Sequence, residues 1–202
     1  MGLTGGLASG KSTVGDMLRG NEIPVLDADL VVHDLYRPGA AGTQAVVEIF
    51  GPGILDSEGG VDRGALGGRV LRDRGLRLAL EAAIHPLVRT EIQLWLESLG
   101  PVPVAVVEAA LLVETGSYRA YDGLVVVWCR REQQLDRARA RGITESRALG
   151  LLDAQNPLDD KREVADVVID NSGPPEALEA EFTRAWDKVE SLCSRREPTS
   201  TE

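Results

Sequence analysis

Short apolar runs rich in valine and isoleucine recur along the chain and alternate with stretches of helical periodicity. Each run is almost continuously apolar, which is typical of strands in a parallel sheet that is covered by helices on both faces. The pattern therefore predicts an α/β fold with a five-stranded parallel sheet, its strands at residues 2–4, 23–26, 102–107, 124–128 and 167–169.

The segments between these strands differ in length, and two of them are predicted to be helical insertions. Residues 30–99 hold helical patterns, for example over 76–99, and about seventy residues exceed what one crossover helix needs, so we expect a helical subdomain. Residues 131–155 are charged and helical in pattern, with a break at Gly142. The remaining stretches, 1–29, 100–130 and 156–193, would form the core, and the polar residues 194–202 are expected to be disordered.

The composition suits one domain with inserted subdomains, because the 202 residues are 43% hydrophobic and 27% charged. A net charge of −10 argues against general nucleic-acid binding, which needs a basic surface. No apolar run approaches the roughly 20 residues of a membrane span. Cys129 and Cys193 lack metal spacing and offer no disulfide framework, which fits a reducing cytosol. Because the chain opens directly on a glycine-rich loop we also expect no signal peptide, and hence a cytoplasmic protein.

That loop, residues 5–12 (Gly-Gly-Leu-Ala-Ser-Gly-Lys-Ser), fits the phosphate-loop pattern G-x-x-x-x-G-K-[ST] at every fixed position. A triphosphate needs backbone N–H groups that point inward, and Gly5 and Gly10 let the loop wrap that closely. Lys11 would reach the β- and γ-phosphate oxygens, the Ser12 hydroxyl would bind Mg²⁺, and a helix beginning near Lys11 would direct its positive end at the same charge. The alternative is a glycine-rich turn that merely caps a helix.

Two carboxylates, Asp27 and Asp29, follow the second predicted strand. Alternation along an extended segment would point both to one side, at the carboxyl edge of the sheet where ligands bind. One could accept a proton from an attacking hydroxyl while the other orients metal-bound water. The alternative role for Asp29 is to cap the helix predicted to follow it.

Other polar residues are weaker candidates. His85 precedes Pro86 and is expected to end a helix or begin a turn, where a packing role is the usual one. Glu114, just past the third strand, could face the site or could be a surface carboxylate. Within 131–155, Arg137 and Arg141 fall on one helix face at i and i+4 and could close over a triphosphate, although a solvated helix face is an equal alternative.

Taken together, these residues resemble the dephospho-coenzyme A kinase family. The loop at 2–13 and the Leu26-Asp27-Ala28-Asp29 sequence are similar to that family's phosphate loop and paired aspartates. Further matches follow in the family's order, at 50–51, 62–63, 80–87, 111–114, 154–155 and 165–171. The sequence departs from the family pattern at Val70, at Ala110 and Val113, and at Leu151.

The resemblance implies a P-loop kinase core with a helical substrate domain and a mobile lid at 131–155. It implies transfer of the ATP γ-phosphoryl group to the 3′-hydroxyl of dephospho-coenzyme A, with Mg²⁺, by a monomer. Asp29, supported by Asp27, would deprotonate the hydroxyl. Lys11, Arg141 and Arg137 would neutralise charge on the transferring oxygens. The implied nucleotide contacts are Gly5, Gly6, Ala8, Ser9, Gly10, Lys11, Ser12, Thr13 and Asn171, with Ser12 on the metal; the implied acceptor contacts are Thr4, Asp29, His85 and Glu114.

Two other functions remain open at the level of sequence. A kinase for another small hydroxylic or nucleotide acceptor would keep the loop and the lid but change the insertion at 30–99. A nucleotide-binding switch protein would hydrolyse ATP slowly and without an acceptor.

Overall fold

The structure, a computed structural model, describes residues 1–194. The described chain has two compact units, the first formed by Met1–Leu26 with the chain from Pro101 onward and the second by Asp27–Gly100. Segment 131–155 belongs to the first unit. None of the helices in the described part of the chain is long and apolar enough to cross a bilayer.

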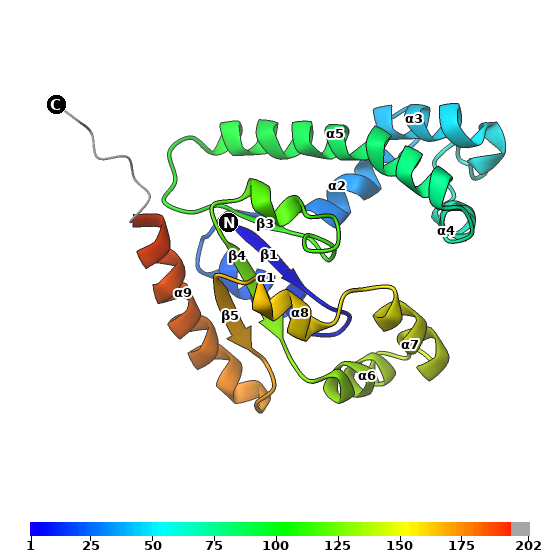
Figure 1. The fold of residues 1–202 in the computed structure, drawn as a ribbon. Coiled ribbons are helices and arrows are strands. Elements are labelled where there is room, and N and C mark those ends of the chain that lie inside the picture. Colours follow the sequence, from blue (N-terminus) through cyan, green and yellow to red (C-terminus); the bar gives the residue numbers. More distant parts are fainter. Residues whose placement is uncertain (195–202) are drawn as a thin grey trace. The chain divides into compact units, whose positions relative to one another are not determined.

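The first unit is built on a five-stranded parallel sheet with the order β2-β3-β1-β4-β5 (Figure 1). This sheet confirms the predicted α/β class. Its strands are β1 (Gly2–Gly5), β2 (Val25–Asp27), β3 (Val106–Glu108), β4 (Leu124–Trp128) and β5 (Val167–Asp170). The helices of this unit are α1 (Lys11–Gly20), α6 (Arg131–Ala140), α7 (Glu145–Asp153), α8 (Leu158–Glu163) and α9 (Leu178–Ser194), with 3₁₀ turns at Ser117–Ala120 and Pro175–Ala177.

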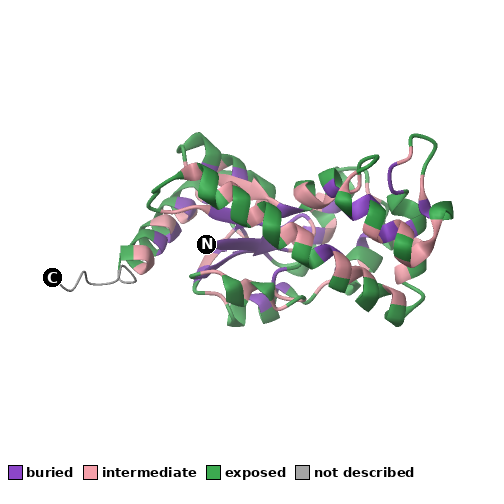
Figure 2. Cartoon of the chain, turned by 90° about the horizontal axis from the view of Figure 1, so that it is seen from above, coloured by how far each residue is buried: buried purple, intermediate pink, exposed green. Residues whose placement is uncertain are grey.

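The core of this unit forms where the sheet packs on α1 and α9. Val14 of α1 and Phe182 of α9 pack in one cluster with Leu3, Val125 and Val127 of the strands. Successive strand residues point to opposite faces, so the buried neighbours of these valines face the other side, where α8 contacts β4. Burial on both faces explains the continuous apolar runs, and β1 is buried along its whole length (Figure 2).

The second unit is helical. A compact apolar cluster that includes Val46, Ile54, Leu66 and Ile84 holds it together. Its helices are α2 (Ala28–Leu35), α3 (Ala41–Phe50), α4 (Arg63–Val70) and α5 (Arg74–Leu99), with a 3₁₀ turn at Pro52–Ile54.

Four local expectations were wrong. The third strand covers 106–108 rather than 102–107, because Pro103 has no N–H to donate to a ladder. The second strand is shifted to 25–27. Helix α5 continues through Pro86, so His85 neither ends a helix nor begins a turn. Ser194, expected in the disordered tail, ends α9, and the rest of that predicted tail lies outside the described residues.

Candidate active site

The phosphate loop joins β1 to α1 and has the backbone that its glycines predict. Gly10 has φ 101°, and a Cβ there would lie 2.2 Å from Asn171 Nδ2, so only glycine fits this position. Ala8 also lies in the left-handed region, with φ 53°. The Ser9 N–H donates to the Gly6 carbonyl at 3.1 Å, which closes the turn. Positive φ is an unfavourable conformation for a non-glycine residue, so surrounding contacts must stabilise it.

The amino end of α1 is suited to bind an anion. Its N-cap, Gly10, has no side chain to satisfy the first-turn N–H groups, and the first turn holds no acidic residue. The positive end of the helix dipole therefore faces the loop. The buried Ser9 hydroxyl also lacks a hydrogen-bond partner among the described residues, so a phosphate oxygen would satisfy a donor that the protein leaves unsatisfied.

The same end of α1 can contribute to a Mg²⁺–nucleotide site. Ser12 and Thr13 are exposed in the first turn of the helix. Within residues 1–194 no group of three or more His, Cys, Asp or Glu side chains could hold a metal ion. Mg²⁺ bound with a nucleotide needs only one or two protein oxygens, because phosphates and waters complete its shell. The Ser12 hydroxyl fits that requirement.

Lys11 forms an ion pair that the sequence analysis missed. Its Nζ lies 2.9 Å from Oε1 of Glu108, whose other oxygen accepts from Arg19 at 3.3 Å. Glu108 ends β3 and is 1% exposed, so two cations compensate one buried charge. A single carboxylate at the end of an otherwise apolar strand was the signal that could have identified it.

Two predicted site residues contact the protein backbone near the loop. Asn171 follows β5 and donates from Nδ2 to the Ser9 carbonyl at 2.8 Å. Thr4 is fully buried in β1, and its hydroxyl donates to the Ala110 carbonyl at 3.2 Å. These bonds fix the loop and the end of β1 against neighbouring strands.

Glu114 lies in a buried network with a lysine that the sequence analysis did not single out. Lys161 of α8 is 0% exposed and donates to Gly5 O (3.1 Å), Ala110 O (2.9 Å) and Glu114 Oε1 (2.7 Å). Burial lowers the pKa of Lys161, the carboxylate of Glu114 opposes that shift, and the charge of Lys11 adds to it. Lys161 thus ties the end of β1 to the segment after β3.

The arginines of segment 131–155 have different environments. Arg131 and Arg139 are half-exposed and pair with Asp153 and Asp136, which makes them surface ion pairs. Arg137 donates from Nη2 to the Asn171 carbonyl at 2.8 Å, while its buried Nη1 has no partner among the described residues. Arg141 is exposed at the C-cap of α6. Arg137 therefore has an unused donor beside a residue that contacts the phosphate loop.

The aspartate pair has a different local geometry from the one predicted. Asp27 is the N-cap of α2, and its Oδ1 accepts from the N–H groups of Asp29 (2.9 Å) and Leu30 (3.2 Å). Asp29 already lies in the helix, so alternation along a strand does not relate the two side chains, and the capping residue is Asp27, not Asp29. Both belong to the second unit, as does His85, which is exposed on α5; Thr4 and Glu114 belong to the first.

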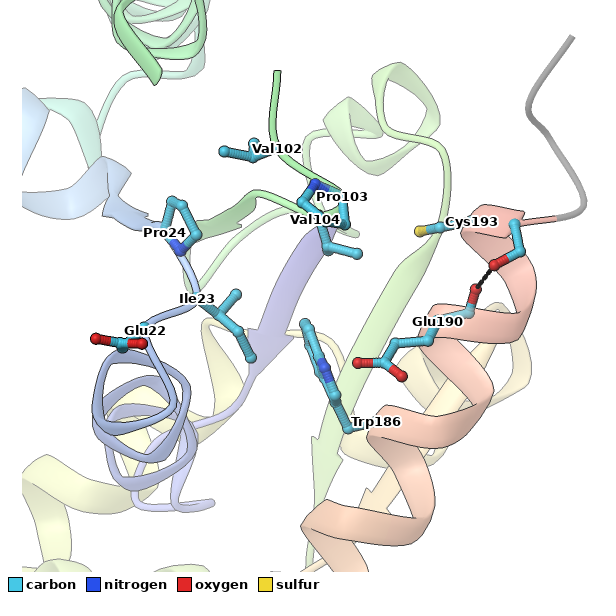
Figure 3. A pocket seen from close by; sticks show the side chains of 10 residues that line it. Glu22, Ile23, Pro24, Val102, Pro103, Val104, Trp186, Glu190 and Cys193 are labelled. Atoms are coloured by element: carbon cyan, nitrogen blue, oxygen red, sulfur yellow. Dashed lines mark hydrogen bonds between the residues drawn. The ribbon is translucent and has the colours of Figure 1, made fainter. Parts of the chain in front are cut away.

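A separate pocket of about 520 Å³ lies in the first unit between the β2–β3 edge and α9 (Figure 3). Its wall includes Ile23, Val104, Trp186 and Cys193, and the Trp186 ring faces the side chains of Ile23 and Val104. None of the predicted site residues lines this pocket. It is therefore distinct from the phosphate loop.

A parallel sheet with a phosphate loop between its first strand and first helix defines the P-loop nucleotide-binding class. Comparison with known proteins narrows this class. Residues 1–176 match the family described as Dephospho-CoA kinase. A dephospho-CoA kinase of Geobacter sulfurreducens is 43% identical over 191 residues, 93% of this chain and 97% of that protein. One of Frankia casuarinae is 37% identical over 100% of this chain and 86% of its own.

Solved structures share the fold of this chain. A protein of Thermus thermophilus superposes with a TM-score of 0.81 at 32% identity, over 93% of this chain and 96% of its own. Dephospho-CoA kinase from Campylobacter jejuni shares the fold, with a TM-score of 0.69 at 23% identity over 94% of this chain and 96% of its own. The chain belongs to the dephospho-CoA kinase family, a family of ATP-dependent kinases that use Mg²⁺.

Proposed function

We propose that this chain transfers the γ-phosphoryl group of ATP to the 3′-hydroxyl of dephospho-coenzyme A, the final step of coenzyme A synthesis. The observation that carries the proposal is the family match over residues 1–176, which includes a phosphate loop with every fixed position intact. The bond between the γ-phosphorus and the β–γ bridging oxygen breaks, a bond to the ribose oxygen forms, and the hydroxyl proton leaves to a base.

The first unit would bind and orient the triphosphate. Backbone N–H groups of the loop and the amino end of α1 would hold the β-phosphate, and Lys11 would move from Glu108 to the phosphate oxygens. Arg137, whose Nη1 is unsatisfied, and Arg141 would neutralise charge that develops during transfer. Mg²⁺, held through Ser12, supplies charge neutralisation at the β- and γ-phosphates when bound.

The second unit would supply the base. Asp29 is the candidate that takes the ribose proton, and Asp27 holds the start of α2 through its two capping bonds. Thr4, His85 and Glu114 stay predictions as acceptor contacts.

The deciding experiment incubates the purified chain with ATP, Mg²⁺ and dephospho-coenzyme A and looks for coenzyme A by mass. ADP release coupled to a panel of other hydroxylic acceptors is the comparison. A chain that phosphorylates another acceptor better than dephospho-coenzyme A, or that releases ADP at the same rate without any acceptor, contradicts the proposal.

Asp29→Asn tests the proposed base. The substitution keeps the size of the side chain and removes its basicity, so we expect kcat to fall by about 10² or more. Asp34→Asn is a matched control on the same helix, because Asp34 is exposed and pairs only at the surface with Arg37 at 2.8 Å. Full turnover in Asp29→Asn would remove that carboxylate from the mechanism.

We also propose that the protein acts as a cytoplasmic monomer without a nucleic-acid partner. The net charge of −10 supports the lack of a nucleic-acid partner. Light scattering coupled to size-exclusion chromatography would test the monomeric state, and a stable dimer at micromolar concentration would refute it.

A further inference from the structure

In the phosphate loop, the backbone carbonyl and the backbone N–H of Leu7 both form hydrogen bonds with glutamine side chains. The Leu7 carbonyl accepts from Gln134 Nε2 at 2.7 Å, and the Leu7 N–H donates to Gln155 Oε1 at 3.0 Å. Gln134 is 4% exposed and lies on α6, while Gln155 follows the end of α7. The two glutamines thus come from opposite ends of segment 131–155 and meet at Leu7.

The orientation of each amide follows from its partner. A backbone carbonyl can only accept and a backbone N–H can only donate, so Gln134 must present its NH₂ and Gln155 its oxygen. This asymmetry gives the two side chains opposite chemical requirements. Position 134 must supply a hydrogen-bond donor, and position 155 must supply an acceptor.

Packing reinforces the two hydrogen bonds. Leu7 and Ala8 lie in one apolar cluster with Ala138 of α6 and Ala148 of α7. A Cβ at Gly6 would lie 2.6 Å from Gln134 Nε2, so the second glycine of the loop leaves the space in which this amide binds. The tip of the phosphate loop therefore lies against the segment predicted to be the lid.

The residue held in this way is next to the strained part of the loop. Ala8, which follows Leu7, has φ 53°, a conformation that an alanine does not keep without external support. The bonds to Leu7 fix the peptide groups before this turn, and the Asn171 bond to the Ser9 carbonyl fixes those after it. The anion-binding arrangement of the loop depends on both.

We propose that Gln134 and Gln155 are positioning residues that hold the phosphate loop in its nucleotide-binding conformation, and that they couple nucleotide affinity to segment 131–155. The inference rests on the proposed function only in requiring that the loop binds a nucleotide. The identity of the acceptor does not enter.

The test places the same two substitutions at each glutamine and measures the Kd of ADP with Mg²⁺ by calorimetry. At Gln134, Glu sets a carboxylate against the Leu7 carbonyl, so Gln134→Glu should weaken ADP binding tenfold or more and Gln134→Met should weaken it less. At Gln155, Glu keeps the acceptor, so Gln155→Met should weaken binding more than Gln155→Glu. Each Glu variant adds the same charge beside the same residue, so a charge effect alone would give the same order at both positions.

Further readouts separate positioning from general stability. Gln93→Met, on an exposed glutamine of α5 that bonds Glu97, is the control for loss of an amide and should leave the Kd unchanged. In turnover assays the Gln134 variants should raise the KM for ATP while the KM for the acceptor stays the same. Should Gln134→Glu fail to fold, Gln134→Met should still weaken ADP binding relative to the wild type, and the Gln155 pair still tests the acceptor requirement: tighter binding by Gln155→Met than by Gln155→Glu would overturn the inference.

Two outcomes would overturn the inference: the same order of Met and Glu at both positions, or a lowered melting temperature with an unchanged Kd for ADP. Both outcomes are independent of whether coenzyme A is made. A chain that makes coenzyme A but shows either result retains its proposed function and loses this inference.

Discussion

At the scale of single residues, the charges at the loop carry most of the chemistry. The chain has three lysines, and two of them, Lys11 and Lys161, bond to groups at or beside the phosphate loop. Lys161 bonds two backbone carbonyls and one carboxylate, so its charge is compensated although it is fully buried. A buried, fully bonded cation of this kind holds several segments together at once.

Lys161→Met should be strongly destabilising. Methionine has a similar length but removes the cation that pairs with Glu114 and the hydrogen bonds that Lys161 donates to the carbonyls of Gly5 and Ala110. Breaking a buried ion pair costs about 3 kcal/mol. Urea denaturation measures the loss in free energy of unfolding. Lys188→Met, on an exposed lysine of α9, is the matched control and should change stability by less than about 0.5 kcal/mol. Equal stabilities of the two variants would contradict the role of the network.

The same variants check the charge of Lys161 through pH. Burial lowers the folded-state pKa of Lys161 below its ordinary 10.5. At any pH between the folded-state pKa and 10.5, the unfolded chain therefore binds a proton that the folded chain has lost. Stability contributed by this group therefore rises with pH in that window and is lost as pH falls through the folded pKa. Wild type should show a more positive slope of unfolding free energy against pH, up to 10.5, than Lys161→Met. Parallel slopes would contradict the shifted pKa.

At the scale of elements, local signals and tertiary packing agree for the phosphate loop and disagree for α5. The glycines and the following helical pattern correctly predict a turn and then α1 from Lys11. The same kind of reasoning at Pro86 is wrong, because α5 continues to Leu99. Ile84, Leu80 and Val88 pack in the apolar cluster of the second unit, and this burial outweighs the missing hydrogen bond at Pro86.

Pro86→Ala should stabilise the helix. Alanine restores an N–H that can bond the carbonyl four residues earlier and removes the clash of the ring, a defect of about 3 kcal/mol that the greater flexibility of the unfolded chain reduces by about 1 kcal/mol. We expect the free energy of unfolding to rise by about 1 to 2 kcal/mol in urea denaturation. Pro52→Ala is the control, since Pro52 begins a 3₁₀ turn where proline is tolerated, and it should give no gain. A loss of stability in Pro86→Ala would show that α5 depends on the ring.

At the scale of the whole molecule, an acidic protein has to bind an anion. The net charge is −10, so attraction of a triphosphate must come from local groups at the amino end of α1 and from Lys11. A nucleotide can bind such a site only in the folded protein, because the unfolded chain does not keep the loop in place.

Nucleotide should therefore stabilise the fold, and above its Kd the gain should grow with the logarithm of its concentration. ADP with Mg²⁺ at one hundred times its Kd should add about 2.7 kcal/mol to the free energy of unfolding. Lys11→Met should lose most of this gain, while Lys188→Met should keep it, as measured by denaturation with and without ADP. Stabilisation that survives in Lys11→Met would place the nucleotide elsewhere.

By itself, the sequence determined the α/β class, the phosphate loop and the family, because each depends on residues close together in the chain or on the order of motifs. The spacing of residues within the loop directly reflects its backbone geometry. The apolar composition of the strands directly reflects their burial.

Only the tertiary structure decided which side chains support the loop. Glu108 meets Lys11, Lys161 meets the Gly5 carbonyl, and Gln134 and Gln155 meet Leu7, in each case across about a hundred residues or more. Glu108 carries a local signal, as the one carboxylate in an otherwise apolar strand, but no local pattern shows that any of these side chains meets the loop. They become functional only when parallel strands and the helices after them bring distant segments to one end of the sheet, where buried polar groups must find partners.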